Sequence, residues 1–217
     1  MENYTLSSRQ IPLYGEYDVI VVGGGPAGCA AAISASRAGK KVLLIEDSGM
    51  LGGAGTRGLV SAWTPFSDGV RALYAGLAHE VFRRTLAATP YLDPKSIDWV
   101  PIDPEALKTT YDEMTAEAGV MVLFHTRLAS AETEDVRVKA LICANKTGLC
   151  AFTAPMYVDC TGDADLCAYA GVPFQKGDEN GETQPATHCF ILANVNEEAY
   201  HAMPSIRPQN PESILYR

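Results

Sequence analysis

Short apolar runs and a helical repeat alternate near the start of the chain. An apolar, β-branched run at 18–22 predicts a strand, glycines form a turn at 23–25, and an alanine-rich segment at 26–38 predicts a helix. A second apolar run at 41–46 predicts another strand. Strand, helix and strand in this order make a βαβ unit, whose two strands lie parallel in one sheet.

The next region predicts two further helices with a loop between them. Apolar residues recur at helical spacing over 70–87, which is typical of an amphipathic helix, and the proline-containing stretch 89–104 is expected to be a loop. The Asp-Pro-Glu sequence at 103–105 supplies a capping side chain, a proline at the first helical position and an acid in the first turn. A helix should therefore begin there and run to about Ala118.

Shorter elements fill the second half of the chain. Residues 120–124 have the composition of a buried strand, and 127–160 predict several short antiparallel strands with the clearest turn at 145–148 and an apolar last strand. A short helix is expected over 163–170. In the polar remainder, the strand candidate is 188–195.

These elements predict an α/β fold, with a Rossmann-like parallel sheet and a small antiparallel β-meander. We expect residues 1–16 to be a polar leader and 17–171 to form the main domain, with an insertion of helix and loops at about 59–102. Residues 172–217 follow this domain.

Composition and charge narrow the class of protein. The chain has 217 residues, and its 17 Lys and Arg against 26 Asp and Glu give a formal charge of −9, which disfavours nucleic acid as a partner. The uncharged run between Asp18 and Arg37 contains the glycine turn, so no membrane span is expected, and the N-terminus lacks a signal sequence. Six cysteines without paired spacing predict neither a metal site nor a disulfide framework and favour a cytoplasmic protein.

The glycine turn carries the chemistry. Residues 23–28 satisfy the G-x-G-x-x-G pattern between a predicted strand and a predicted helix, which is the context of a dinucleotide-binding fingerprint. Gly23 permits the tight turn, Gly25 lets the backbone approach a pyrophosphate, and Gly28 lets the helix pack against the strand. Pro26 and Ala27 open the helix, whose N-terminal amides and dipole favour phosphate.

Two later segments extend this interpretation. Glu46 ends the second strand, eighteen residues after Gly28, where a carboxylate accepts hydrogen bonds from ribose hydroxyls and disfavours the 2′-phosphate of NADP. The glycine-rich segment 51–56 offers exposed backbone amides to an extended cofactor. Residues 158–165 repeat the order of strand, glycine turn and helix, although a helix start capped by an aspartate also explains them.

In combination, these three segments resemble FAD-dependent oxidoreductases of the glutathione-reductase-like fold, in the branch related to fumarate reductase and succinate dehydrogenase flavoproteins. The resemblance covers about 17–195 and implies that 17–171 is an FAD-binding domain with noncovalent FAD. It also implies that 172–217 is the incomplete start of a second, substrate domain. It places the glycine turn at the pyrophosphate, Glu46 on the adenosine ribose and the backbone near Arg127 or Leu128 at the adenine. The remaining cofactor contacts that it implies are Gly52, Gly53, Thr56, Thr161, Gly162 and Asp163.

The resemblance implies hydride transfer between a small organic substrate and FAD. Members of this family are longer, so we expect this chain to be an N-terminal portion: a truncation, a split-gene subunit completed by a partner chain or a second copy, or a degraded reading frame. The alternatives are a non-catalytic FAD-binding subunit and, with less support, an NAD-dependent dehydrogenase. Arg57 and His188 are the weak candidates for a catalytic role, and Cys29 is expected to have no redox role.

Overall fold

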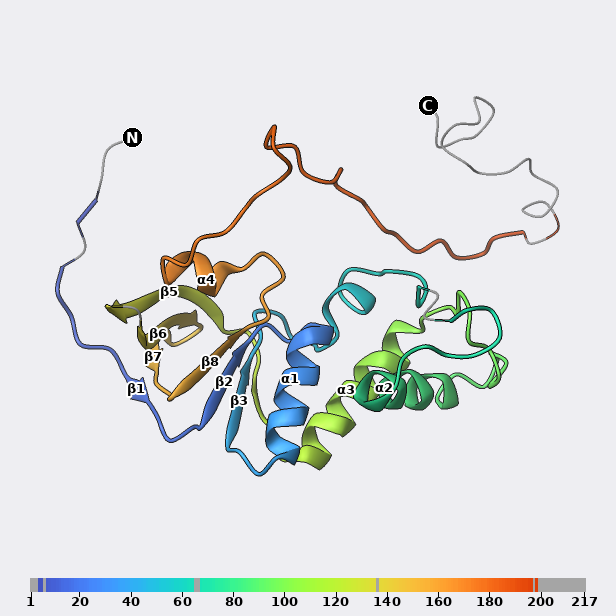
Figure 1. Cartoon of the computed structure of the whole chain (residues 1–217), viewed down its shortest axis with the longest axis horizontal. Helices are drawn as coiled ribbons and strands as arrows, with labels where there is room; N and C mark the ends of the chain where they lie inside the picture. Colours follow the sequence, from blue (N-terminus) through green and yellow to red (C-terminus); the bar gives the residue numbers. More distant parts are fainter. Residues whose placement is uncertain (1–3, 6, 65–66, 136, 197, 199–217) are drawn as a thin grey trace. The chain divides into compact units, whose positions relative to one another are not determined.

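The computed structural model describes residues 4–5, 7–64, 67–135, 137–196 and 198 (Figure 1). The chain divides into two units, residues 1–185 and 186–217, and each is described by itself. The first unit has three layers. Helices cover one face of a parallel sheet, and a second sheet covers the other face (Figure 1).

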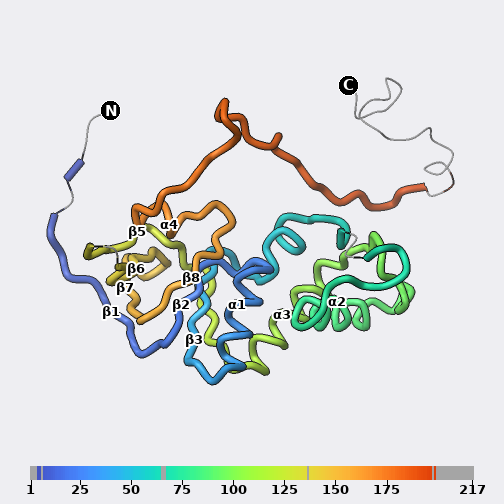
Figure 2. Tube along the Cα trace, viewed as in Figure 1, coloured from blue at the N-terminus to red at the C-terminus, as the bar shows by residue number. Residues whose placement is uncertain are grey.

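The central layer is a parallel sheet of four strands in the order β4-β3-β2-β8. Strands β2 (Val19–Val22) and β3 (Val42–Ile45) confirm the predicted βαβ unit. Strand β8 (Met156–Asp159) pairs with β2, so that segments far apart in sequence lie side by side (Figure 2). Strand β4 (Met121–Leu123) forms the edge beside β3.

Two helices pack on one face of this sheet, and a third packs on them. Helix α1 (Pro26–Arg37) joins β2 to β3, and α3 (Pro104–Ala118) lies beside it. Helix α2 (Gly76–Ala87) is joined to α3 by the Arg84–Glu117 ion pair of 2.8 Å. The predicted start of α3 is confirmed, because the side chain of its N-cap, Asp103, accepts hydrogen bonds from two backbone amides of the first turn.

The opposite face carries the predicted antiparallel meander. It consists of β5 (Arg127–Glu134), β6 (Arg137–Asn145) and β7 (Gly148–Phe152). The side chains of β2 point alternately to the two faces of the parallel sheet, so the sheet packs against both outer layers. Val21 is buried against the helices, whereas Ile20 and Val22 are buried against the meander. The α/β fold predicted from the sequence is therefore confirmed.

The helix predicted over 70–87 begins six residues late. The Asp68 side chain accepts hydrogen bonds from the backbone N–H groups of Val70 (3.0 Å) and Arg71 (2.8 Å), which fixes a turn where the helix was expected. Val70 and Leu73 are consequently exposed. These apolar residues do recur at helical spacing, but the hydrogen bonds from the backbone to the Asp68 side chain stabilise a turn instead of the first turns of the helix.

Three further expectations need correction. The strand predicted as buried over 120–124 is the edge strand β4, and Met121 is exposed. Within the polar leader, β1 (Leu13–Tyr14) pairs in parallel with β7. Residues 188–195 form no strand in the described part of the second unit, where their apolar side chains are exposed. An isolated strand without a pairing partner is not stable.

Candidate cofactor-binding site

The turn between β2 and α1 is closed by backbone packing. Gly23 has a φ of +99°, and a Cβ there would lie 2.3 Å from the carbonyl oxygen of Cys160 on the neighbouring strand end. A Cβ at Gly28 would lie 1.7 Å from the carbonyl oxygen of Gly23. Both distances are impossible for real atoms, so no side chain fits at either position. These two glycines hold α1 against the sheet.

Gly25 is different, because a Cβ built there meets no atom within 4 Å. Its φ of −70° is accessible to any residue, so conformation does not require glycine at this position. Gly25 is also the N-cap of α1. No side chain of the described residues caps this helix, and its first turn carries no acid. The first-turn amides therefore face open space, as an anion site requires.

That open space belongs to a cavity of about 720 Å³. The cavity lies at the carboxyl ends of β2, β3 and β8, where ligands bind in open α/β sheets. Most of the residues expected to contact the cofactor line it together: Gly23, Gly25, Pro26, Ala27, Glu46, Gly53, Leu128, Thr161, Gly162 and Asp163. Segments predicted separately along the sequence thus meet at one site.

Three expected contact residues do not line the cavity. Gly28 is packed beneath the first turn. Gly52 donates its N–H to the carbonyl oxygen of Gly24 at 2.8 Å, which fixes the 51–56 segment against the turn. The buried Thr56 hydroxyl donates to the carbonyl oxygen of Leu51 at 2.7 Å. All three lie behind the residues that line the cavity and hold those residues in position.

Glu46 connects the first turn to the segments that follow β3 and β4 through hydrogen bonds. Its carboxylate is 8% exposed and accepts a hydrogen bond from the N–H of Gly24 (2.6 Å) and another from the N–H of Ser48 (2.8 Å). Its backbone oxygen accepts from the N–H of Thr126 at 3.0 Å. This last bond brings residues 126–128 beside the end of β3, which explains how Leu128 reaches the cavity.

The second turn, between β8 and α4 (Asp165–Tyr169), is held by side chains. Asp159 accepts hydrogen bonds from the N–H and hydroxyl of Thr161 (3.0 and 2.8 Å) and from the N–H of Cys167 (2.9 Å). The Thr161 hydroxyl also accepts from the N–H of Asp165 at 2.9 Å. Burial raises the pKa of Asp159, but these hydrogen bonds outweigh burial and bring its pKa below the ordinary value.

Neither weak catalytic candidate is placed at a reacting centre by these contacts. Arg57 lines the cavity and forms an exposed ion pair of 2.8 Å with Asp47. His188 is exposed and belongs to the second unit. Cys29 is buried in α1, and burial raises the pKa of its thiol to about 12, so the thiolate that redox chemistry needs is suppressed.

The sequence profile of a family described as FAD dependent oxidoreductase matches residues 18–214. The chain belongs to this family. The resemblance drawn from the three glycine-containing segments is confirmed, and FAD is the cofactor of the family. Among curated relatives, dihydrolipoyl dehydrogenase of Trypanosoma brucei brucei is 51% identical over 45 residues, which are 21% of this chain and 9% of that protein. Urocanate reductase of Eggerthella lenta is 37% identical over 71 residues, 30% of this chain and 12% of that protein.

Solved structures support the same FAD-dependent oxidoreductase fold. A geranylgeranyl bacteriochlorophyll reductase-like protein from Thermoplasma acidophilum matches with a TM-score of 0.51 and 21% identity, covering 74% of this chain and 43% of that one. L-proline dehydrogenase from P. horikoshii matches with a TM-score of 0.50 and 16% identity, covering 77% and 58%. The match spans only a small part of the curated relatives and about half of these structures.

The sequence of this family member did not single out every residue of the cavity. The missed lining residues are Val22, Ile45, Asp47, Ala54, Thr126, Asp159, Cys160, Ala164, Asp165 and Cys167. A usable signal exists for several, because Cys160 directly follows β8 and Asp47 lies two residues after β3, and the carboxyl ends of these parallel strands share one sheet edge. In the described residues, no helix is long and apolar enough to cross a membrane.

Proposed function

We propose that the 720 Å³ cavity binds FAD noncovalently and that the chain is the FAD-binding portion of an oxidoreductase acting on a small organic substrate. The observation that carries this proposal is the pairing of two turns. The glycine turn after β2 and the turn after β8 line one cavity, and a Cβ at Gly25 of the first turn would meet no atom within 4 Å. Such an arrangement suits a ligand with a pyrophosphate at its centre.

The residues of the site divide between the parts of the cofactor. The uncapped N-terminus of α1 would hold the pyrophosphate. The Glu46 carboxylate accepts hydrogen bonds from two backbone N–H groups, and its remaining lone pairs would accept hydrogen bonds from the hydroxyls of the adenosine ribose. Leu128 would contact the adenine, and residues 161–163 would form the second contact. When bound, FAD supplies hydride chemistry, while the protein binds and orients it.

Charges around the cavity support a division of this kind. The lining includes five acidic side chains against the two arginines Arg57 and Arg127. A phosphate placed among carboxylates would be repelled, so the helix N-terminus is the favourable anion position on this wall. The carboxylates are suited instead to hydroxyl groups. We therefore infer that the acidic lining fixes the direction in which the dinucleotide lies.

We further propose that polypeptide beyond the described residues completes the substrate site. The described cavity lining contains no histidine, and the second unit supplies no strand among its described residues. The completing part would be further sequence of the same chain, a partner chain or a second copy. The substrate domain beginning at 172 and a cytoplasmic location stay predictions.

Titration of cofactor-free protein with FAD tests the proposal, with quenching of flavin fluorescence as the readout. We expect saturable binding by the wild type and binding at least tenfold weaker in Gly25→Ala, because the added methyl group occupies the cradle. Gly181→Asn, a loop change at a left-handed position outside the cavity, serves as the control and should bind FAD normally. Uptake of NAD but not FAD, or no uptake of either, would contradict the proposal.

A further inference from the structure

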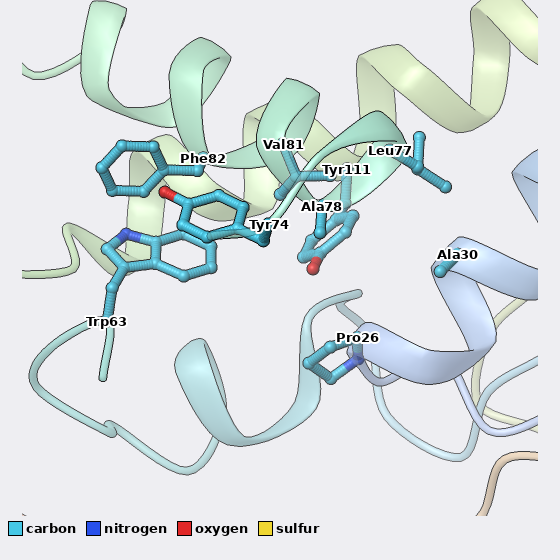
Figure 3. A pocket seen from close by; sticks show the side chains of 9 residues that line it. All are labelled: Pro26, Ala30, Trp63, Tyr74, Leu77, Ala78, Val81, Phe82 and Tyr111. Atoms are coloured by element: carbon cyan, nitrogen blue, oxygen red, sulfur yellow. The ribbon is translucent and has the colours of Figure 1, made fainter. Parts of the chain in front are cut away.

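A second, smaller pocket lies on the other side of the α1 N-terminus. It has a volume of about 210 Å³ and is bounded by α1, α2, α3 and the segment that carries Trp63 (Figure 3). None of its lining side chains carries a formal charge: they are Pro26, Ala30, Trp63, Tyr74, Leu77, Ala78, Val81, Phe82 and Tyr111. Pro26 also lines the proposed FAD cavity, so the two spaces share one residue.

One wall of this pocket is an organised aromatic cluster. Trp63 and Tyr74 each meet Phe82 edge to face, with ring centroids 5.6 and 5.8 Å apart and interplanar angles of 85° and 88°. Figure 3 shows the three rings gathered at one end of the pocket. Edge-to-face contacts fix ring orientations, so this wall is a preformed surface for a planar apolar group.

The opposite end carries one polar atom. Tyr111 is 4% exposed, and its hydroxyl makes no hydrogen bond with any described residue. Figure 3 shows the hydroxyl oxygen directed into the space between Ala78 and Pro26. Burial raises the pKa of Tyr111, so the group remains a neutral O–H donor. No buried side-chain nitrogen or oxygen of the described residues lacks a partner, so this unbonded hydroxyl is accessible from the pocket, where a ligand carbonyl can accept its hydrogen bond.

We propose that this pocket binds a neutral, single-ring aromatic ligand whose carbonyl oxygen accepts a hydrogen bond from Tyr111. Size supports one ring, since an engineered apolar cavity of about 150 Å³ holds benzene. The uncharged lining rejects a carboxylate or an ammonium group, because burying an unpaired charge is far costlier than burying a carbonyl. The site is distinct from the FAD cavity and does not depend on it.

Saturation-transfer NMR on the full chain tests this site with three probes of similar size. Acetophenone has the ring and the carbonyl, ethylbenzene lacks the acceptor, and benzoate carries a charge. We expect acetophenone to bind most tightly and benzoate not to bind. Tyr111→Phe keeps the ring and removes the donor, so it should weaken acetophenone about fivefold and leave ethylbenzene unchanged.

Two further variants separate this pocket from unspecific binding. Ala78 lies at the exposed mouth, so Ala78→Phe should fill the pocket without unfolding the protein and abolish binding of both neutral probes. Tyr169→Phe, an equal change at a tyrosine outside the pocket, should have no effect.

The proposal is overturned if no probe saturates, if Ala78→Phe binds as the wild type does, or if Tyr111→Phe retains the preference for acetophenone. All titrations are run with and without added FAD. Probe binding to protein that takes up no FAD would still support the pocket, while contradicting only the FAD proposal.

Discussion

The two turns that line the large cavity perform the same geometric task by opposite means. After β2, the turn is closed by backbone atoms against backbone atoms, at positions where a Cβ has no space. After β8, the turn is closed by a chain of side-chain bonds from Asp159 through Thr161 to the N–H of Asp165. The first turn is defined by missing side chains, and the second by specific side chains.

This difference separates two kinds of sensitivity. At Gly23 and Gly28 of the first turn, an added Cβ collides with the backbone, so even alanine is a severe substitution there. In the second turn, a Cβ at Gly162 would meet no atom within 4 Å, and stability depends on polar partners that can be removed one at a time. Four substitutions test the comparison, in order of decreasing effect.

The largest effect is expected for Gly28→Ala. A helical glycine normally gains stability on replacement by alanine, but here the new Cβ would lie 1.7 Å from the carbonyl oxygen of Gly23. We expect the free energy of unfolding to fall by about 3 kcal/mol, measured by urea denaturation. Gly25→Ala, one turn earlier, is the matched control and should change stability by less than about 0.5 kcal/mol. Equal stability of the two variants would refute steric closure of the first turn.

Asp159→Asn should destabilise the protein by about 2 kcal/mol at pH 7, because the amide cannot accept from both Thr161 and the N–H of Cys167. The pKa of Asp159 is lower in the folded protein than in the unfolded chain. Its stabilisation is therefore complete above the unfolded pKa, near 3.9, and is lost as the pH falls through the folded value. The difference between wild type and variant should shrink in urea denaturations below about pH 4. A constant difference would argue against a charged Asp159.

Thr161→Val should cost about 1 kcal/mol, because it removes the hydroxyl that donates to Asp159 and accepts from the N–H of Asp165. Thr161→Ser retains the hydroxyl and is expected to recover most of the loss. Thermal unfolding of the two variants compares them directly. If serine were as destabilising as valine, the methyl group rather than the hydroxyl would account for the effect.

The smallest stability effect is expected for Arg57→Gln. Its ion pair with Asp47 is exposed, and such pairs contribute less than about 0.5 kcal/mol. An FAD titration of the same variant is the sharper measurement, since Arg57 lines the cavity. Unchanged stability with weaker FAD binding would assign Arg57 to the cofactor. Unchanged affinity would leave it as a surface ion pair.

The comparison also explains what the sequence predicts well. A close approach of two backbones can be met only by glycine, so the pattern at 23–28 predicts its own geometry. Asp103 and Pro104 predict the start of α3 for a related reason, because capping is a local interaction. Ten residues expected at the cofactor meet in one cavity for the further reason that parallel strands share a carboxyl edge.

What the sequence does not predict depends on partners far along the chain. The pairing of β1 with β7 joins residues 13–14 to 151–152, and nothing local in Leu13 or Tyr14 specifies it. Likewise, the apolar composition of 120–124 does not reveal that β4 is an edge strand. The late start of α2 results from two competing local signals, the helical spacing of apolar residues and the turn at Asp68. The sequence pattern does not show which of the two is stronger.

The register of β2 with β8 has a consequence for synthesis on the ribosome. Val19 pairs with Met156, and the turn at Gly23 is closed by the backbone of Cys160. Strands β2 and β3 with α1 can form as soon as the first third of the chain has emerged, yet the wall beside them does not exist until β8 follows. A nascent chain arrested before β8 would therefore contain the complete fingerprint and no cavity in which to use it.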